Sequence, residues 1–452
     1  MTTKNILQRL VLTTIALLLA NFMGGLDSTI VNTALPEITQ ALDGISLVGW
    51  ISSIFMLGTA TTTILWSRLG ERIGNKRTFQ LSLIVFMLSS MVAGLAPNML
   101  WLIIARAVMG ISTGGMVSVP FIIYADLYPD AARRARALGW VTASFTLSTI
   151  IGPILGGIMV DHLSWRWIFF INLPFGILSW LLLQINYQEK RQAQPGKFDY
   201  PGTIILVLGL TGLLFGFDAI RISGLRSTIL LGGSVLILIG FYWFESHQTD
   251  AIVPIRLLKN GRVQIQNLIM FLLNGSFIAY SVYAPMWSQR IFKTNAILGG
   301  ATQIAGSILL VIGTQVTTRL MRTWSYKQIV LVGTTSMVLS CLIMFLATRH
   351  ASYWLIFLAG AFEGTAIGLA FTPMQVSVQD GVSQDLIGIS TTFSLLFRTL
   401  GEAFMAAVFG ALLNLRSDLY LGLHLIMEVS FILALVAFCL NLFRKEPVKQ
   451  TH

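Results

Sequence analysis

Long runs of apolar residues, separated by short polar segments, follow one another along the whole chain. A run of about 17–25 such residues can cross the hydrocarbon core of a bilayer as a helix. The predicted limits of these runs are 10–33, 46–66, 78–97, 99–125, 136–160, 167–186, 201–218, 227–244, 264–289, 296–318, 328–348, 352–375, 386–413 and 421–443. The pattern therefore predicts an all-α integral membrane protein with fourteen spans, whose even number places both termini on one side.

Composition agrees with this class. Hydrophobic residues make up 55% of the chain and charged residues only 11%, whereas soluble domains carry about 25% charged residues. The two cysteines, Cys341 and Cys439, both lie in apolar runs. We therefore expect no disulfide framework, no bound metal and no cofactor. A phosphate-binding loop of an ATP-driven motor is also missing from the sequence.

Basic residues indicate the orientation. With the N-terminus inside, 21 of the 30 Lys and Arg residues fall on inner segments and seven on outer segments. Such an excess marks the cytoplasmic side. We therefore expect a multi-pass protein of the cell (inner) membrane with both termini in the cytoplasm. The same excess accounts for the net charge of +11, so a nucleic-acid partner is not needed.

An internal repeat divides the chain. The segment from Trp101 to Pro120 reads WLIIARAVMGISTGGMVSVP, and the one from Trp354 to Pro373 reads WLIFLAGAFEGTAIGLAFTP, at a constant offset of 253. Chance similarity between apolar helices is the alternative, but the matched Trp and Pro ends favour a true repeat. We predict an N-terminal six-helix half at 1–190 and a C-terminal one at 263–452. Between them, 191–262 forms an inserted two-helix hairpin with an amphipathic linker.

Small residues punctuate the fifth predicted span, which ends in a Gly-Pro-x-x-Gly-Gly sequence formed by Gly152, Pro153, Gly156 and Gly157. Neighbouring helices in a membrane can satisfy the backbone groups that proline frees, and glycines let those helices approach closely. A packing seam is one interpretation. The run also resembles the antiporter signature on the fifth helix of proton-coupled exporters in the major facilitator superfamily.

The segment at 67–77 reads SRLGERIGNKR and lies between the second and third predicted spans. It resembles the loop motif of the same superfamily, in which an acid meets a helix N-terminus and biases the conformational equilibrium. An ordinary basic inner loop is the alternative. The matching residues are Leu69, Arg72, Gly74, Lys76 and Arg77, whereas Glu71 replaces the motif's Asp and Ser67 its Gly.

Two charged residues lie within the apolar runs of the first half. Asp27 belongs to the sequence LDSTIVNTALP, which closely resembles the first-helix motif of the fourteen-span drug:proton antiporters. Arg106, with Gly110, matches the fourth-helix motif. An isolated carboxylate within a membrane is costly and therefore a candidate for function. The resemblance implies that Asp27 and Arg106 are partners in proton coupling; a purely structural ion pair is the alternative.

Glu363 and Glu402 are further acids inside predicted spans. By the repeat, Glu363 takes the place of Gly110, and Glu402 that of Pro153. Arg398 lies four residues before Glu402, so the two can pair on one helix face. We expect Glu363 and Glu402 to exchange protons or bind a cationic substrate, with a static Arg398–Glu402 pair as the alternative.

Adaptable aromatic and methionine side chains can complete a substrate surface, although most such residues in a membrane protein face lipid or pack. The candidates are Met23, Met116, Phe145, Tyr280, Tyr283 and Met374.

The resemblance extends over essentially the full chain and implies the major facilitator fold, with two six-helix halves that rock around a central cavity. It predicts a non-enzymatic, monomeric exporter that exchanges protons for amphiphilic, cationic drugs or other toxic small molecules, and that contributes to antibiotic resistance. Export of one defined metabolite, peptide or lipid is the first alternative. A non-transporting membrane sensor is the second.

Overall fold

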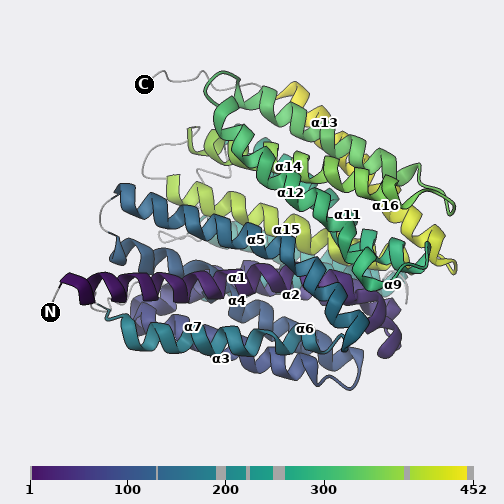
Figure 1. Cartoon of the computed structure of the whole chain (residues 1–452). Helices are drawn as coiled ribbons and strands as arrows, with labels where there is room; N and C mark the ends of the chain where they lie inside the picture. The colour runs from purple at the N-terminus through teal and green to yellow at the C-terminus, as the bar shows by residue number, and fades with distance from the viewer. Residues whose placement is uncertain are drawn as a thin grey trace. The chain divides into compact units, whose positions relative to one another are not determined.

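A computed structural model describes residues 3–128, 131–189, 200–219, 224–247, 260–380 and 387–444, and all regular elements within them are helical (Figure 1). The prediction of an all-α membrane fold is confirmed. The helices are α1 (Thr3–Ala41), η1 (Ile45–Leu47), α2 (Val48–Ile73), α3 (Asn75–Gly94), α4 (Met99–Leu127), α5 (Ala131–His162), α6 (Trp167–Phe170), α7 (Asn172–Asn186), α8 (Tyr200–Asp218), α9 (Gly224–Glu245), α11 (Gly261–Arg290), α12 (Ala296–Leu320), α13 (Tyr326–Phe345), α14 (Tyr353–Asp380), α15 (Ile387–Leu413) and α16 (Leu419–Phe443).

Thirteen segments in the described part of the chain are long and apolar enough to cross a membrane. In α8 the apolar stretch is shorter and runs from Ile204 to Phe217. The fourteenth span therefore stays a prediction. The first span is longer than predicted, because α1 continues through Pro36 and ends at Ala41.

Contacts divide the chain into two compact units. The first contains residues 1–47 and 54–198, in which α1 packs against α5 and α7, and α3 packs against α4. The second contains Val48–Ser53 and Asp199–His452, in which α14 packs against α12 and α13, and α11 against α15 and α16. Helices α8 and α9 form the inserted hairpin, whose α8 contacts α15. The predicted domain limits stay a prediction, and residues 248–259 of the predicted linker lie outside the described part.

The sixth span is interrupted close to its start. Helix α6 ends at Phe170 and α7 begins at Asn172, with Ile171 between them. Pro174 explains the interruption, because its nitrogen carries no hydrogen to donate to the carbonyl of Phe170. Proline is tolerated in the first turn of the new helix. Asn172, the first residue of α7, is buried in the interior of the first unit.

Helix α3 begins at a tight turn, where Gly74 has φ +94°. Glycine adopts this left-handed conformation without the strain that a side chain adds. The carboxylate of Glu189 lies over the helix start and accepts hydrogen bonds from the backbone N–H groups of Asn75, at 2.5 Å, and Lys76, at 3.3 Å. The turn and its carboxylate cap fix the α2–α3 corner.

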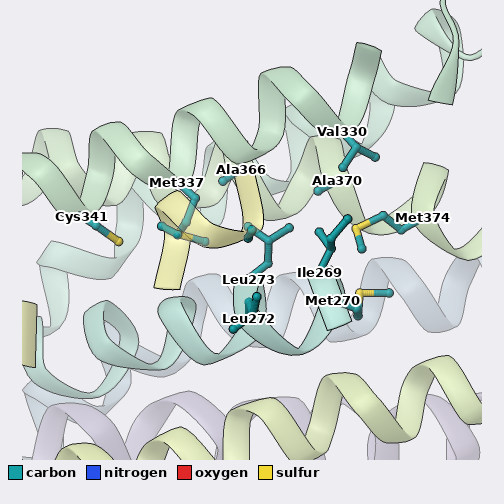
Figure 2. Close-up of a cluster of buried hydrophobic side chains, with 12 residues drawn as sticks. Ile269, Met270, Leu272, Leu273, Val330, Met337, Cys341, Ala366, Ala370 and Met374 are labelled. Atoms are coloured by element: carbon teal, nitrogen blue, oxygen red, sulfur yellow. The ribbon is translucent and has the colours of Figure 1, made fainter. Parts of the chain in front are cut away.

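The second unit has a continuous apolar core, part of which Figure 2 shows. Ile269, Met270 and Leu273 of α11 meet Met337 of α13 and Met374 of α14. Helices α12 and α14 approach so closely that a side chain at position 364 would collide with the backbone of α12. Small residues thus set the helix spacing, as expected for helices whose association depends on close van der Waals contact.

Candidate functional site

Asp27 of α1 and Arg106 of α4 form a buried ion pair. The guanidinium Nη1 donates to Oδ2 of Asp27 at 2.6 Å, and the exposed fractions of the two side chains are 0% for Asp27 and 2% for Arg106. A charge in this setting is stable only when it is paired and hydrogen-bonded. The structure therefore places together the two charged residues that the sequence singled out in the first half.

Three more side chains lie around this pair in the described part of the chain. The guanidinium carbon of Arg106 lies 4.0 Å from the ring centroid of Phe55 in α2, in cation–π geometry. Asn172, at the start of α7, approaches Oδ1 of Asp27 with its Nδ2 at 3.5 Å. The same amide donates to Oγ of Ser90 in α3 at 3.0 Å. The carboxylate thus meets a cation on one oxygen and an amide on the other.

The small residues of α5 contact α1 close to Asp27. A side chain at position 152 would collide with Thr29, and one at position 156 would lie 2.9 Å from Ile30. Pro153 and Gly157 are buried. This part of α5 therefore lies against the helix turns that follow Asp27, and any bulk added there displaces the helix that carries the carboxylate.

In the second unit, Glu363 of α14 is only 3% exposed. Its Oε1 accepts no hydrogen bond within the described residues. Tyr280 of α11 reaches two neighbouring helices. Its hydroxyl lies 2.9 Å from the carbonyl oxygen of Thr302 in α12 and 2.8 Å from that of Ile356 in α14. Tyr280 therefore joins α11, α12 and α14 through backbone groups.

Arg398 and Glu402 form an i, i+4 pair on α15, with Nε donating to Oε1 at 3.0 Å. The pair is less buried than the one in the first unit, because the Arg398 side chain is 32% exposed. The guanidinium also lies 4.9 Å from the ring centroid of Phe371. Glu402 thus has a cationic partner on its own helix.

The predicted substrate residues fall into different environments. Met23, Met116, Tyr283 and Met374 are buried, as is Tyr280, whereas Phe145 is exposed. The ring of Tyr283 packs edge-on against Phe409 at 6.4 Å. These contacts are those of packed helix interfaces, and a role in substrate binding stays a prediction for all six residues.

The loop motif is partly described. Leu69 is half-buried, Arg72 and Arg77 are exposed, and the side chain of Glu71 lies outside the described part. The ammonium group of Lys76 donates to the backbone oxygens of Gln184, at 2.8 Å, and Tyr187, at 2.7 Å. Together with the Glu189 cap, Lys76 ties the start of α3 to the end of α7.

Sequence reasoning missed Phe55, Ser90, Asn172 and Glu189. One signal was present for Asn172, since an amide two residues before a proline inside an apolar run marks a break in a helix. The others approach the site from separate helices and carry no local signal. In the described part of the chain, no three His, Cys, Asp or Glu side chains gather in a way that could hold a metal ion.

Solved structures with this fold are transporters. A D-xylose–proton symporter superposes with a TM-score of 0.72 at 13% identity, over 98% of this chain and 99% of its own. An auto-inhibited peptide transporter of the POT family gives 0.69 at 13% identity, over 97% and 98%. The chain has the fold of a multi-pass membrane transporter rather than that of an enzyme.

The chain belongs to the Major Facilitator Superfamily, which it matches over residues 17–406. It is 29% identical over 410 residues to the multidrug transporter protein MdtP of Bacillus subtilis, covering 89% of this chain and 75% of that protein. Multidrug resistance protein 3 of the same organism is 27% identical over 407 residues, covering 88% and 78%. The efflux pump aunC of Aspergillus niger is 29% identical over 420 residues, covering 88% and 78%.

Proposed function

We propose that this protein exports amphiphilic, cationic small molecules in exchange for protons, as a member of the fourteen-span drug:proton antiporters. The buried Asp27–Arg106 pair carries the proposal, because it is a carboxylate that a proton or a cation can neutralise in place of its partner. The names of the relatives, multidrug transporters and efflux pumps, support the direction and the breadth of substrates.

The coupling follows from competition at one carboxylate. A proton on Asp27 neutralises the group and weakens its attraction for a cationic substrate, so that the two ligands exclude each other. Arg106 sets the strength of this competition, because it already contacts Oδ2. Alternating exposure of Asp27 to the two sides of the membrane then exchanges one ligand for the other.

The second unit supplies two further acids. Glu363 is buried and its Oε1 accepts no bond among the described residues, so the neutral acid is the favourable form there. Glu402 is held by Arg398 and can be released when a cationic substrate takes the place of the guanidinium. We propose Glu363 and Glu402 as secondary proton or cation sites.

The proposed setting is the cell (inner) membrane, with both termini in the cytoplasm and the protein acting as a monomer. The excess of Lys and Arg on alternate segments supports this orientation. A role in antibiotic resistance follows if the exported cations include antiseptics or drugs.

Dye export from proteoliposomes tests the proposal. The purified protein is reconstituted, and transport of ethidium is measured with and without an imposed pH gradient. Transport by the wild type accelerates with the gradient, and Asp27→Asn abolishes this acceleration. Glu37→Gln is the matched control, because Glu37 lies on the same helix but is exposed. Gradient-driven export by Asp27→Asn at the wild-type rate contradicts the proposal.

The same assay separates the alternatives. A panel of cationic dyes is compared with anionic and zwitterionic metabolites, peptides and lipids. A broad response to cations supports the multidrug function. A response to one neutral or anionic compound alone supports an exporter of a defined metabolite, and no flux of any compound leaves a sensor.

A further inference from the structure

The boundary between α6 and α7 lies close to the carboxylate of Asp27. Asn172 is the first residue of α7 and is fully buried, with an exposed fraction of 0%. Asn172 therefore brings a buried polar side chain toward Asp27.

The amide of Asn172 is only partly satisfied. Its Nδ2 donates to Oγ of Ser90 at 3.0 Å, and Ser90 in turn donates to the backbone oxygen of Phe169 at 2.8 Å. The second contact of Nδ2, with Oδ1 of Asp27, is long at 3.5 Å. The amide oxygen Oδ1 of Asn172 is buried and accepts no hydrogen bond within the described residues.

An acceptor without a donor, beside a carboxylate, favours a proton between the two. A primary amide carries donors and an acceptor on one rigid group, so it can bond to either form of a carboxyl group. When Asp27 is ionised, Nδ2 of Asn172 has only the long contact with the carboxylate, and Oδ1 of Asn172 accepts no hydrogen bond within the described residues. With a proton on Oδ1 of Asp27, that O–H can donate to Oδ1 of Asn172, and no acceptor is left idle.

We infer that Asn172 is a positioning residue that recognises the protonated form of Asp27 through its side-chain oxygen. The amide turns about its anchor on Ser90, exchanging the long Nδ2 contact for an O–H···O bond. The inference rests on the proposed proton coupling at Asp27 and deepens it, because it names the group that holds the proton-loaded state.

Arg106 and Asn172 then act in opposite directions. Arg106 contacts the carboxylate of Asp27 through its cationic group, whereas the oxygen of Asn172 can bond only to the carboxylic acid. On the other helices packed against α1, Asp161 and His162 are at the far end of α5. Arg166, just before α6, donates to the backbone oxygen of Ala96. The balance at Asp27 is therefore set mainly by the cation on Oδ2 and the amide on Oδ1.

A pH series tests this inference. Ethidium binding to the purified protein in detergent is followed by fluorescence, and the pH at half-maximal binding is recorded. Asn172→Leu removes the acceptor at similar volume, so this midpoint moves to lower pH by about one unit, a tenfold change in proton binding. Asn172→Asp keeps an acceptor and adds a like charge, so the midpoint moves to higher pH.

Two further variants make the outcome decisive. Asn186→Leu, at the other end of α7, is the matched control and leaves the midpoint in place, because within the described residues Asn186 bonds to the carbonyl of its own helix turn at Leu182. If Asn172→Leu and Asn172→Asp both keep the wild-type midpoint while Asp27→Asn loses the pH dependence, the role of Asn172 is overturned alone. If Asp27→Asn keeps the wild-type pH profile, the proposed coupling fails together with this inference.

Discussion

Asp27 and Arg106 are 79 positions apart in the sequence and come from different helices, yet they meet through a 2.6 Å hydrogen bond inside the first unit. Oδ2 of Asp27 contacts the guanidinium, and Oδ1 lies near the amide of Asn172. The two oxygens of the carboxylate thus face different partners from different helices.

Removing Arg106 leaves the buried carboxylate of Asp27 without its cationic partner. Arg106→Leu is expected to lower the free energy of unfolding by about 3–5 kcal/mol, the usual cost of breaking a buried ion pair on one side. The double variant Asp27→Asn with Arg106→Leu regains most of that stability but not the gradient-driven transport. Thermal unfolding in detergent and dye export measure the two effects. A singly substituted protein as stable as the wild type would show that the pair is solvated.

Gly156 tests the contact between α5 and α1. Gly156→Leu is expected to block export, because even the first carbon of a side chain would lie 2.9 Å from Ile30 and push the two helices apart. Gly232→Leu on α9 is the matched control, since nothing lies within 4 Å of a side chain there. Equal transport by the two variants contradicts a tight α1–α5 contact.

Glu402 tests selectivity for charge. Glu402→Gln is expected to slow export of cationic dyes several-fold while a neutral substrate is less affected. The unfolding temperature stays nearly constant, because an i, i+4 pair that is partly exposed contributes only about 0.3–0.5 kcal/mol. Equal loss of transport for charged and neutral substrates assigns Glu402 and Arg398 a static structural role.

Asp418 links stability to pH outside the membrane spans. The backbone N–H of Tyr420 donates to Asp418 and lowers its pKa below the usual 3.8, against an opposing effect of desolvation, and Arg349 lowers it further. A depressed pKa in the folded state stabilises the protein above the usual value, and this contribution is lost as the pH falls through the folded pKa. We expect Asp418→Asn to flatten the acid side of a melting-temperature profile; an unchanged acid slope contradicts the assignment.

Much of the fold could be predicted from hydropathy, because a membrane-spanning helix needs about twenty consecutive apolar residues. The pairing of Asp27 with Arg106 could be predicted from the resemblance, and it agrees with the high cost of an unpaired charge inside a membrane. The boundary between α6 and α7 could not be predicted from hydropathy, because a count of apolar residues does not register the missing N–H of Pro174. Phe55 and Glu189 also remained hidden, since ordinary residues become notable only through neighbours from distant segments.

Tyr280 has a single hydroxyl hydrogen and two carbonyl oxygens within reach, one on α12 and one on α14. It can donate to only one of them at a time. The hydroxyl therefore bonds to α12 in one orientation and to α14 in the other, and it has an acceptor in both. One tyrosine hydroxyl on α11 thus serves two neighbouring helices of the second unit through their backbone carbonyls.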